Sequence, residues 1–215
     1  MTPIPSATVI PLRERDTLEV LLLRRNKKLV FHGGDWVFPG GRVDDEDRQH
    51  DELATARHTA VREAHEEAAL VLTPEQLVPF AHWTTPEIRP RRYATWFFVA
   101  HADTDARADG VELTEARWWP LAEALRARDA GTIGLPPPTF VSITLLQTLA
   151  LREALAPRLV ERIVPRVIAV EGGECALYPG DAGYSSSDPT CAGARHRGWY
   201  LRSGWRYERD DHDSA

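Results

Sequence analysis

Apolar and polar positions in the first part of the chain follow the pattern of short strands joined by turns. Residues 7–13 (ATVIPLR) and 18–25 (LEVLLLRR) are two β-rich runs, and the polar stretch 14–17 separates them. This pattern predicts a strand, a turn and a second strand. A short apolar piece over residues 34–43 (GDWVFPGGRV) follows, and Pro39-Gly40-Gly41 interrupts it with a strong turn signal.

The pattern changes to helical spacing between Asp51 and about Leu70. This stretch, DELATARHTAVREAHEEAAL, consists of helix formers and contains no glycine or proline. Small apolar residues recur there at the spacing of one helix face, namely Ala56, Ala60, Val61, Ala64 and Ala68. The sequence therefore predicts one helix over this stretch.

Two further strands and two further helices are expected in the middle of the chain. Residues 91–101 (RRYATWFFVAH) form an aromatic run that predicts a strand. Residues 111–119 predict another strand, which leads through Pro120 into a helix with the sequence LAEALRARD. Residues 139–155 predict a further amphipathic helix after three consecutive prolines.

The last third of the chain differs in character. Short β-rich runs over residues 166–170 and 174–178 flank a pair of glycines, and the sequence GWYLRSGWRYE predicts a final hairpin about Ser203-Gly204. The polar tail over residues 208–215 is expected to be disordered.

Length and composition fit an α/β protein with one main domain and an extension. The chain has 215 residues, of which 43% are hydrophobic and 27% charged, values close to the globular average. We expect a domain over residues 1–155 and a small β-rich C-terminal extension over residues 156–215, built from β-hairpins and the tail. The sequence leaves three roles open for the extension: shaping a substrate pocket, forming a homodimer or covering the sheet.

Charge and targeting signals narrow the partners. The formal net charge of −6 argues against a broad nucleic-acid surface, which needs basic residues, but allows a small anionic ligand. No apolar run is long enough to span a bilayer, and the start of the chain lacks the regions of a signal peptide, so we expect a cytoplasmic protein with no membrane partner. Cys175 and Cys191 fit no zinc-binding spacing.

Three carboxylates of the predicted helix share one face. Glu63, Glu66 and Glu67 stand at i, i+3 and i+4, where their mutual repulsion needs solvent or a cation to offset it. On the helix alone, a solvated acidic face is the commoner explanation. The upstream glycine turn and the acidic loop over residues 44–47 favour a metal-phosphate site instead, because Mg²⁺ binds carboxylates together with substrate phosphates.

These residues carry a resemblance to the Nudix hydrolases. The family signature is Gly-x5-Glu-x7-Arg-Glu-U-x-Glu-Glu-x-Gly-U, where U is aliphatic, and Gly41 together with the block from Arg62 to Glu67 matches it. The resemblance covers roughly residues 5–155. It implies an α/β/α sandwich with a mixed β-sheet, a loop-helix-loop that holds Mg²⁺ or Mn²⁺, and hydrolysis of the diphosphate in a nucleoside diphosphate linked to another group.

The resemblance also implies roles for the residues that match. Glu63 and Glu67 become the principal metal ligands, and Glu66 a further ligand or the group that orients or deprotonates water. Arg62 would hold a glutamate in place through charge-assisted hydrogen bonds. Independently of the resemblance, the tight turn at Gly40 and Gly41 leaves the backbone free to approach a ligand. The catalytic base stays open between Glu66 and three other glutamates, Glu87, Glu112 and Glu115.

The sequence departs from the signature at three places. Asp47 stands where the first glutamate is expected, which weakens a functional role for that position. The stretch from Asp47 to Arg62 is seven residues longer than in the signature, so the loop before the helix is enlarged. Ala69 replaces the final glycine, and we expect it to adopt a right-handed conformation, since alanine would be strained in the left-handed one.

A second, weaker pattern indicates the substrate. Leu21, Leu22, Arg25, Gly34 and the run Phe38-Pro39-Gly40-Gly41 agree in register with the pattern of coenzyme A Nudix enzymes. The enlarged loop resembles the insertion of the coenzyme A diphosphatase-like branch. Mismatches occur at three positions, Leu23, Asn26 and Val30.

Arginines are the candidates for holding substrate phosphates, since their guanidinium forks match phosphate oxygens. They are Arg25, Arg89, Arg91 and Arg92. The expected substrate is therefore a small nucleotide diphosphate, with coenzyme A or an acyl derivative as the favoured example.

Other functions stay open at this stage. One group comprises diphosphatases of ADP-sugars or dinucleotides and sanitisers of damaged nucleoside triphosphates. A different class is a non-catalytic Nudix domain that binds a nucleotide and regulates another protein. The retained Glu63, Glu66 and Glu67 argue against the second class, because binding alone does not need such clustered charge.

Overall fold

The chain folds into two compact units. The computed structural model describes residues 2–28 and 33–210. The larger unit comprises Ile4–His82 and Ala94–Glu161. The smaller unit combines the start of the chain up to Pro3 and Trp83–Tyr93 with the C-terminal region that begins at Arg162. Val30, one of the mismatched positions, lies outside the described residues.

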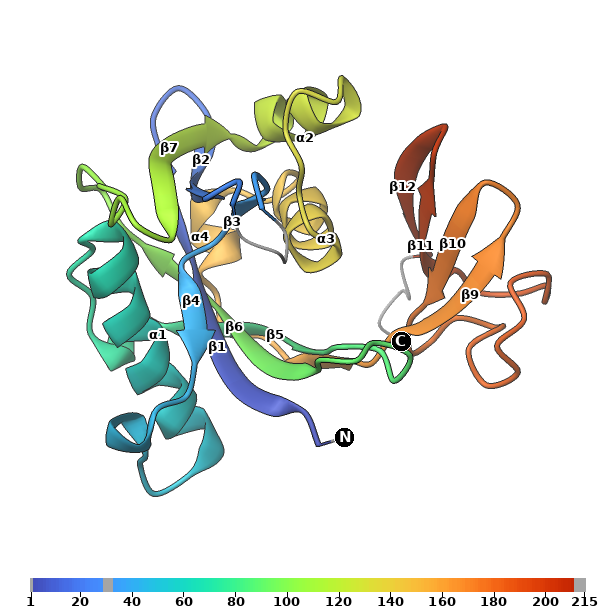
Figure 1. The fold of residues 1–215 in the computed structure, drawn as a ribbon, viewed down its shortest axis with the longest axis horizontal. Coiled ribbons are helices and arrows are strands. Elements are labelled where there is room, and N and C mark those ends of the chain that lie inside the picture. The colour runs from blue at the N-terminus through green and yellow to red at the C-terminus, as the bar shows by residue number, and fades with distance from the viewer. Residues whose placement is uncertain (1, 29–32, 211–215) are drawn as a thin grey trace. The chain divides into compact units, whose positions relative to one another are not determined.

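The larger unit is built on a mixed sheet (Figure 1). Its strand order runs β3-β2-β1-β6-β5, while β4 pairs with β1 and β7 pairs with β2. The strands are β1 (Ile4–Glu14), β2 (Leu18–Arg25), β3 (Trp36–Val37), β4 (Gly40–Arg42), β5 (Val78–Thr84), β6 (Tyr93–His101) and β7 (Leu113–Pro120). The short strand β8 (Glu161–Ile163) starts at the last residue of this unit.

Helices lie on both sides of this sheet, with α1 on one side and α3 and α4 on the other (Figure 1). They are α1 (Glu52–Ala68), α2 (Leu121–Asp129), α3 (Pro137–Leu146) and α4 (Leu151–Ala154), with short 3-10 helices η1 (Asp45–Asp47) and η2 (Pro74–Gln76). Leu21 and Leu23 pack into the core cluster that contains the alanines of α1. Val20 and Leu22 alternate with them on β2 and are also fully buried. Two buried sheet faces and two helical layers confirm the predicted α/β/α architecture.

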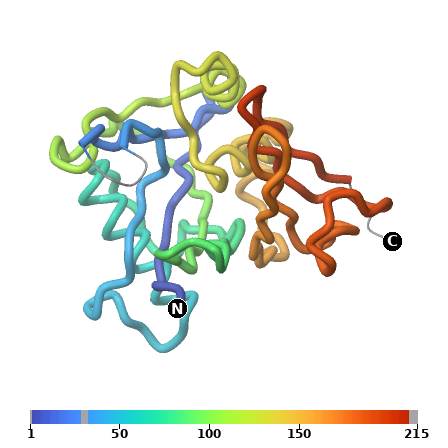
Figure 2. The backbone as a smooth tube through the Cα atoms, turned by 45° about the vertical axis from the view of Figure 1, so that its right-hand side comes forward, coloured from blue at the N-terminus to red at the C-terminus, as the bar shows by residue number. Residues whose placement is uncertain are grey.

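The first strands and the site-bearing helix agree closely with the sequence pattern. Both predicted N-terminal strands are confirmed, and β1 extends further toward the N-terminus than expected. The predicted helix is α1, which begins after Asp51, whose carboxylate accepts a hydrogen bond from the Ala54 N–H at 2.7 Å. Its alanines face the sheet because small side chains let helix and strands approach closely. β4 runs beside β1 at the same side of the unit (Figures 1 and 2).

The smaller unit holds a four-stranded antiparallel sheet. Its order is β12-β11-β10-β9, with β9 (Arg166–Val170), β10 (Gly173–Leu177), β11 (His196–Leu201) and β12 (Gly204–Arg209). The hairpin about Ser203-Gly204 is confirmed, since Leu201 pairs with Gly204. A buried ion pair between Asp181 and Arg197, 2.6 Å apart, ties the long loop after β10 to β11. The predicted disorder of the tail is wrong for its first three residues, since Glu208 and Arg209 belong to β12 and the Asp210 carboxylate accepts a hydrogen bond from the Arg195 N–H; residues 211–215 lie outside the described residues.

The prediction of one amphipathic helix over residues 139–155 is wrong. The structure has α3, which starts within the prolines and ends at Leu146, and a separate α4. Most of α3 is buried, so its apolar residues mark a core helix rather than a half-exposed one. The Glu153 carboxylate accepts a hydrogen bond from the Ala150 N–H at 2.9 Å and so starts the second helix. The strand β5 was not predicted, because its buried run lacks the alternation that marks a half-exposed strand.

The expected conformation of Ala69 is also wrong. This residue caps α1 with φ 55° and ψ 25°, which is the left-handed region. Its N–H donates to the His65 carbonyl at 3.0 Å, and the Leu70 N–H donates to the Ala64 carbonyl at 3.1 Å. These bonds satisfy carbonyls at the helix end, so the cap keeps the geometry of a glycine cap although the residue is alanine. The packing that ends α1 at this point outweighs the preference of alanine for the right-handed conformation.

No helix among the described residues is long and apolar enough to cross a membrane.

We predict that Ala69→Gly stabilises the protein. Glycine relieves the left-handed strain of alanine, which is about 1 kcal/mol, and raises the melting temperature by about 2–4 °C in a chain of this size. The matched control is Ala54→Gly, in the first turn of the same helix, which lowers stability by up to about 1 kcal/mol. Thermal unfolding of the three proteins checks this, and a fall in melting temperature for Ala69→Gly would contradict it.

Candidate active site

The candidate site forms where β4 passes α1. Gly40 and Gly41 of β4 pair with Thr8 and Ala7 of β1. A side chain at Gly40 would collide with the Thr8 hydroxyl and the Ala7 carbonyl, so only glycine allows this close approach to β1. The tight packing brings the β4 backbone within hydrogen-bonding distance of the acidic face of α1.

Each glycine of β4 faces one carboxylate of α1. The Gly40 N–H donates to Oε2 of Glu67 at 2.8 Å. A side chain at Gly41 would overlap the carboxylate of Glu63. The predicted involvement of this turn therefore has a geometric basis. Gly41 leaves room for the Glu63 carboxylate, and Gly40 lets β4 approach β1 closely and offers its N–H to Glu67.

Both carboxylates are in an environment that disfavours their charge. The pKa of Glu67 is raised to about 8, chiefly by burial; the nearby Glu63 and Asp109 contribute to the rise, whereas the Gly40 N–H and Arg25 oppose it. Burial also raises the pKa of Glu63, against the opposing effect of Arg62. A bound cation would reverse these shifts, because an opposite charge favours the ionised carboxylate.

Arg62 connects the loop, the turn and the helix. Its guanidinium bonds Asp47 through Nε at 3.0 Å and Nη2 at 2.8 Å. It also donates to Oε1 of Glu63 and Oε2 of Glu66, both at 3.0 Å, and to the Arg42 carbonyl at 3.1 Å. The predicted role of Arg62 in positioning a glutamate through charge-assisted bonds is consistent with this arrangement. These hydrogen bonds, with that to Asp47 first, raise the pKa of Arg62.

Asp47 is the residue whose importance the sequence reasoning underestimated. Its side chain is 5% exposed, and its carboxylate accepts hydrogen bonds from Arg62, from the Thr59 hydroxyl at 2.9 Å and from the Asp44 N–H at 3.0 Å. Burial alone would raise the pKa of Asp47, but the bonds from Arg62, Asp44 and Thr59 outweigh it and hold the pKa below its usual value. The position in the signature was the available signal, because an aspartate there can anchor Arg62 once the loop brings it close.

Glu66 differs from the other two carboxylates of the helix. Its side chain is 56% exposed, and it is held by Arg62 rather than by β4. Within residues 2–28 and 33–210, no three Asp, Glu, His or Cys side chains lie close enough together to hold a metal ion jointly. The ligand set of Glu63, Glu66 and Glu67 therefore stays a prediction, in which Glu66 would turn from Arg62 toward the other two.

The donors that face β4 fit a divalent cation. Mg²⁺ and Mn²⁺ take oxygen ligands and usually need only one or two carboxylates beside phosphates and water. Glu63 and Glu67 supply two carboxylates, and Oε1 of Glu67 accepts no hydrogen bond from any described residue. The two groups also repel each other electrostatically, which a cation between them would offset.

Two other residues lie within electrostatic range of Glu67. Arg25, at the end of β2, lowers the pKa of Glu67, and its buried Nε has no hydrogen-bond partner among the described residues. This agrees with the prediction that Arg25 holds a phosphate, which stays a prediction. Asp109 was missed by the sequence reasoning, since nothing in its spacing singles it out. Its carboxylate accepts from the Val111 and Leu113 N–H groups and so shapes the loop before β7.

The remaining sequence candidates make other contacts or belong to the smaller unit. Arg91 and Arg92 belong to the smaller unit, and the Nε of Arg92 donates to the Thr85 carbonyl at 3.0 Å, so their role in substrate binding stays a prediction. Among the proposed bases, Glu115 pairs with Arg24 at 3.5 Å, and Glu87 lies in the smaller unit.

Comparison with known proteins identifies the family. The family model described as NUDIX domain matches residues 2–135. This chain belongs to the Nudix family. The resemblance carried by the loop-helix-loop is thereby confirmed.

Named relatives include coenzyme A diphosphatases. The Nudix protein is 30% identical over 132 residues to an acyl-coenzyme A diphosphatase of Xenopus laevis. The matched region covers 55% of this chain and 34% of that protein. It is 43% identical over 63 residues to a peroxisomal coenzyme A diphosphatase of Caenorhabditis elegans, 29% of this chain and 25% of that protein. The matched regions thus span about a third or less of the length of these two relatives. The expected likeness of this chain to coenzyme A diphosphatases is confirmed.

A solved Nudix structure shares the fold. A NUDIX hydrolase from Alicyclobacillus acidocaldarius superposes with a TM-score of 0.67 at 22% identity, over 72% of this chain and 96% of that one. At this identity the likeness concerns the fold alone.

We predict that Asp47→Asn destabilises the Nudix unit by about 1.5–3 kcal/mol, because it removes the charge of the most buried carboxylate that Arg62 contacts and weakens charge-assisted hydrogen bonds. The control is Asp45→Asn on the same loop. Asp45 pairs with Arg48 at the surface, so its loss costs less than about 1 kcal/mol. Urea denaturation at pH 7 measures both.

The pH dependence of this effect has a definite sign. Folding lowers the pKa of Asp47. Its ionised carboxylate therefore contributes fully to the free energy of unfolding above its unfolded-state pKa of about 3.9, and this contribution is lost as the pH falls toward the folded-state pKa. The difference between the native protein and Asp47→Asn should therefore shrink below about pH 4. A difference that grows with acidity, or equal effects of the two substitutions, would contradict the role given to Asp47.

Proposed function

We propose that this Nudix protein is a diphosphatase that hydrolyses the diphosphate of a nucleoside diphosphate linked to another group, with Mg²⁺ or Mn²⁺. The observation that carries the proposal is the burial of Glu63 and Glu67 against the glycines of β4. Two carboxylates kept in a place that disfavours their charge are costly for stability, and a cation with a phosphate ligand accounts for that cost.

The reaction replaces one phosphorus-oxygen bond by another. Water attacks one phosphorus of the diphosphate, the bond to the bridging oxygen breaks, and one proton is released. A divalent cation bound here supplies charge stabilisation for the attacking and departing oxygens. Glu63 and Glu67 would hold it, and Gly40 would keep Glu67 in place through its N–H.

The other residues of the site have supporting roles in this proposal. Arg62 fixes the rotamer of Glu63 and holds Glu66 near the reacting phosphate, where Glu66 can orient or deprotonate water once Arg62 releases it. Arg25 would contact a phosphate oxygen with the side chain whose Nε has no partner. Gly41 leaves room for the substrate and for Glu63.

The favoured substrate is coenzyme A or an acyl derivative, which would yield 3′,5′-ADP and a 4′-phosphopantetheine product. Two observations support it. The residues around Arg25, Gly34 and Phe38-Pro39-Gly40-Gly41 match the pattern of coenzyme A Nudix enzymes, and two relatives bear the name of coenzyme A diphosphatases.

We predict that Glu67→Gln lowers kcat by at least about 10²-fold, since the amide keeps the shape of the side chain but removes the charge of a ligand. Glu63→Gln should have a similar effect. Glu171→Gln, an exposed glutamate in the turn between β9 and β10, is the control and should keep full turnover. Release of product from coenzyme A in the presence of Mg²⁺ is the measurement. Near-normal turnover by Glu67→Gln would remove this helix from the mechanism.

The substrate is tested by kcat/KM for coenzyme A, NADH, ADP-ribose and a nucleoside triphosphate, because discrimination is a ratio of these values. We expect coenzyme A to give the highest value. If any other compound is cleaved ten-fold faster, the substrate is different while the diphosphatase survives. If none is cleaved and a nucleotide still binds, the protein is a non-catalytic Nudix domain.

A further inference from the structure

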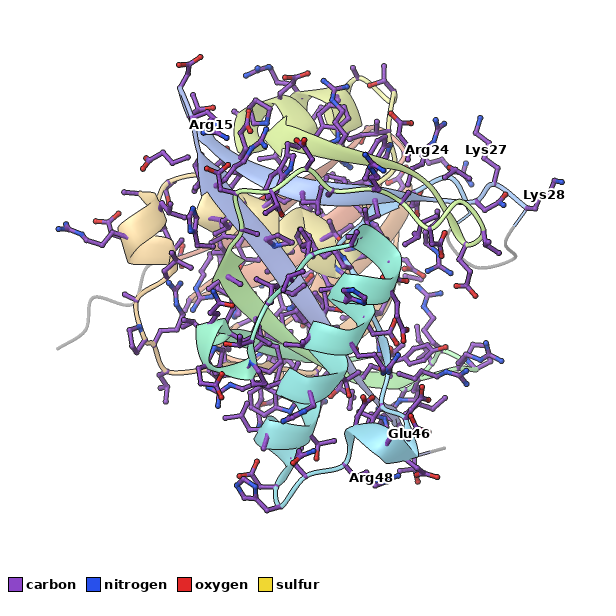
Figure 3. The ribbon with its side chains drawn as sticks, turned by 90° about the vertical axis from the view of Figure 1, so that its left-hand side faces the viewer. Arg15, Arg24, Lys27, Lys28, Glu46 and Arg48 are labelled. Carbon is purple, nitrogen blue, oxygen red and sulfur yellow. The ribbon has the colours of Figure 1, made fainter. Side chains whose placement is uncertain are left out.

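A pocket of about 340 Å³ in the larger unit lies beside the enlarged loop. Its walls include Arg48 and Gln49 of that loop, Glu52 and Ala56 of the first turns of α1, and Trp96 of β6. Figure 3 shows Arg48 and Glu46 on the loop that precedes α1. No assigned role of the site residues uses this pocket.

The enlarged loop is what builds one wall of the pocket. After Asp47, which is anchored to Arg62, the chain continues to the start of α1 and is fixed there by two further hydrogen bonds. The Gln49 N–H donates to the Thr55 hydroxyl at 2.9 Å, and the Gln49 side chain donates to the Asp47 carbonyl at 3.5 Å. The additional residues of the enlarged loop are therefore held in place by hydrogen bonds and form one wall of the pocket.

The charges of the pocket disfavour an anionic ligand. Its charged lining residues are Arg48, Asp51 and Glu52, and Arg48 is already paired with Asp45 at 2.9 Å. The Asp51 carboxylate caps α1, so the helix N-terminus is also satisfied from within the chain. A phosphate would meet more negative than positive charge here, unlike at Arg25.

Trp96 is a wall of the pocket and not a platform for stacking a nucleobase. It is 9% exposed, and its ring is stacked on Phe98 with 6.3 Å between the centroids. His82 approaches it edge-on at 5.0 Å, and the indole N–H donates to Oε1 of Glu52 at 2.7 Å. Because Trp96 is 9% exposed and its indole N–H is engaged, it offers the pocket apolar contact rather than an open ring face.

The pocket is lined by residues of α1 and by the chain just after β4, the same parts of the fold that carry the carboxylates of the candidate site. Val43, in its wall, is two residues beyond Gly41, which corresponds to about 7 Å of extended chain. Ala56 precedes Glu63 by two turns of α1, which corresponds to about 10 Å. A chain of three peptide-like units covers about 10 Å, so a substrate bound at Glu63 can reach the pocket with an extended arm.

We propose that this pocket binds the uncharged arm that the substrate carries beyond its diphosphate, a chain of amide and methylene groups such as the pantetheine part of coenzyme A. The inference rests on the proposed function and names the part of the substrate that the enlarged loop recognises. Apolar walls suit the methylene and methyl groups of the arm, and the negative rim excludes a second phosphate.

Binding of free pantetheine, measured by ligand-observed NMR without any metal, tests the inference independently of turnover. Ala94→Phe fills the pocket from the start of β6, and Val43→Phe fills it from the end of β4. Ala169→Phe, the same substitution at an exposed position of β9, is the matched control. Circular dichroism shows which variants are folded.

We expect the native protein, Ala169→Phe and Glu67→Gln to bind pantetheine, and the two filled variants to bind it about ten-fold more weakly or not at all. In turnover, the filled variants should raise KM for coenzyme A with little change in kcat and leave KM for ADP-ribose unchanged, because only the arm loses its site.

Two outcomes separate the inference from the proposed function. If pantetheine binds and filling the pocket abolishes binding, but no diphosphate is cleaved, the pocket assignment stands and the diphosphatase fails. If coenzyme A is cleaved but native protein does not bind pantetheine, or a folded filled variant binds it equally well, the pocket assignment is wrong. An equal rise in KM for coenzyme A and for ADP-ribose in the filled variants would also overturn the pocket assignment.

Discussion

The candidate site depends on the bonds of a single guanidinium, that of Arg62. It joins Asp47 of the enlarged loop, the Arg42 carbonyl at the end of β4, and Glu63 and Glu66 of α1. A planar fork with five donors can satisfy several acceptors at fixed angles, which a lysine cannot do. The loop, the strand and the helix therefore keep one relative arrangement, and the carboxylates inherit their positions from it.

The same arrangement places charge where the protein alone cannot stabilise it. Glu67 is buried beside Glu63, and the Gly40 N–H is its one hydrogen-bond donor among the described residues. Stability would favour an apolar pair at these positions, so the carboxylates have a use other than packing. A divalent cation and the phosphates of a substrate meet this requirement, while the neighbouring pocket, with its apolar wall and negative rim, suits the uncharged remainder of the molecule.

Sequence patterns predicted the parts that local signals specify. The glycine turn and the carboxylate spacing of α1 follow from steric and helical rules, so Gly40, Gly41 and Glu63 could be singled out directly. The left-handed Ala69 and the division into α3 and α4 could not, because tertiary packing overrides local propensity there. The anchoring role of Asp47 depends on how the enlarged loop folds back onto Thr59, a long-range contact that spacing does not encode.

Equilibrium binding of Mn²⁺, followed by electron paramagnetic resonance without substrate, tests most directly whether the carboxylates of α1 form a metal site. We expect the native protein to bind Mn²⁺. Replacing Glu63 and Glu67 together by glutamine should weaken Mn²⁺ binding by more than about ten-fold, since even partners outside the ligand set contribute that much. The double variant should keep its fold, because burial disfavours both charges. Equal Mn²⁺ binding by the native protein and the folded double variant would show that these carboxylates do not form the metal site.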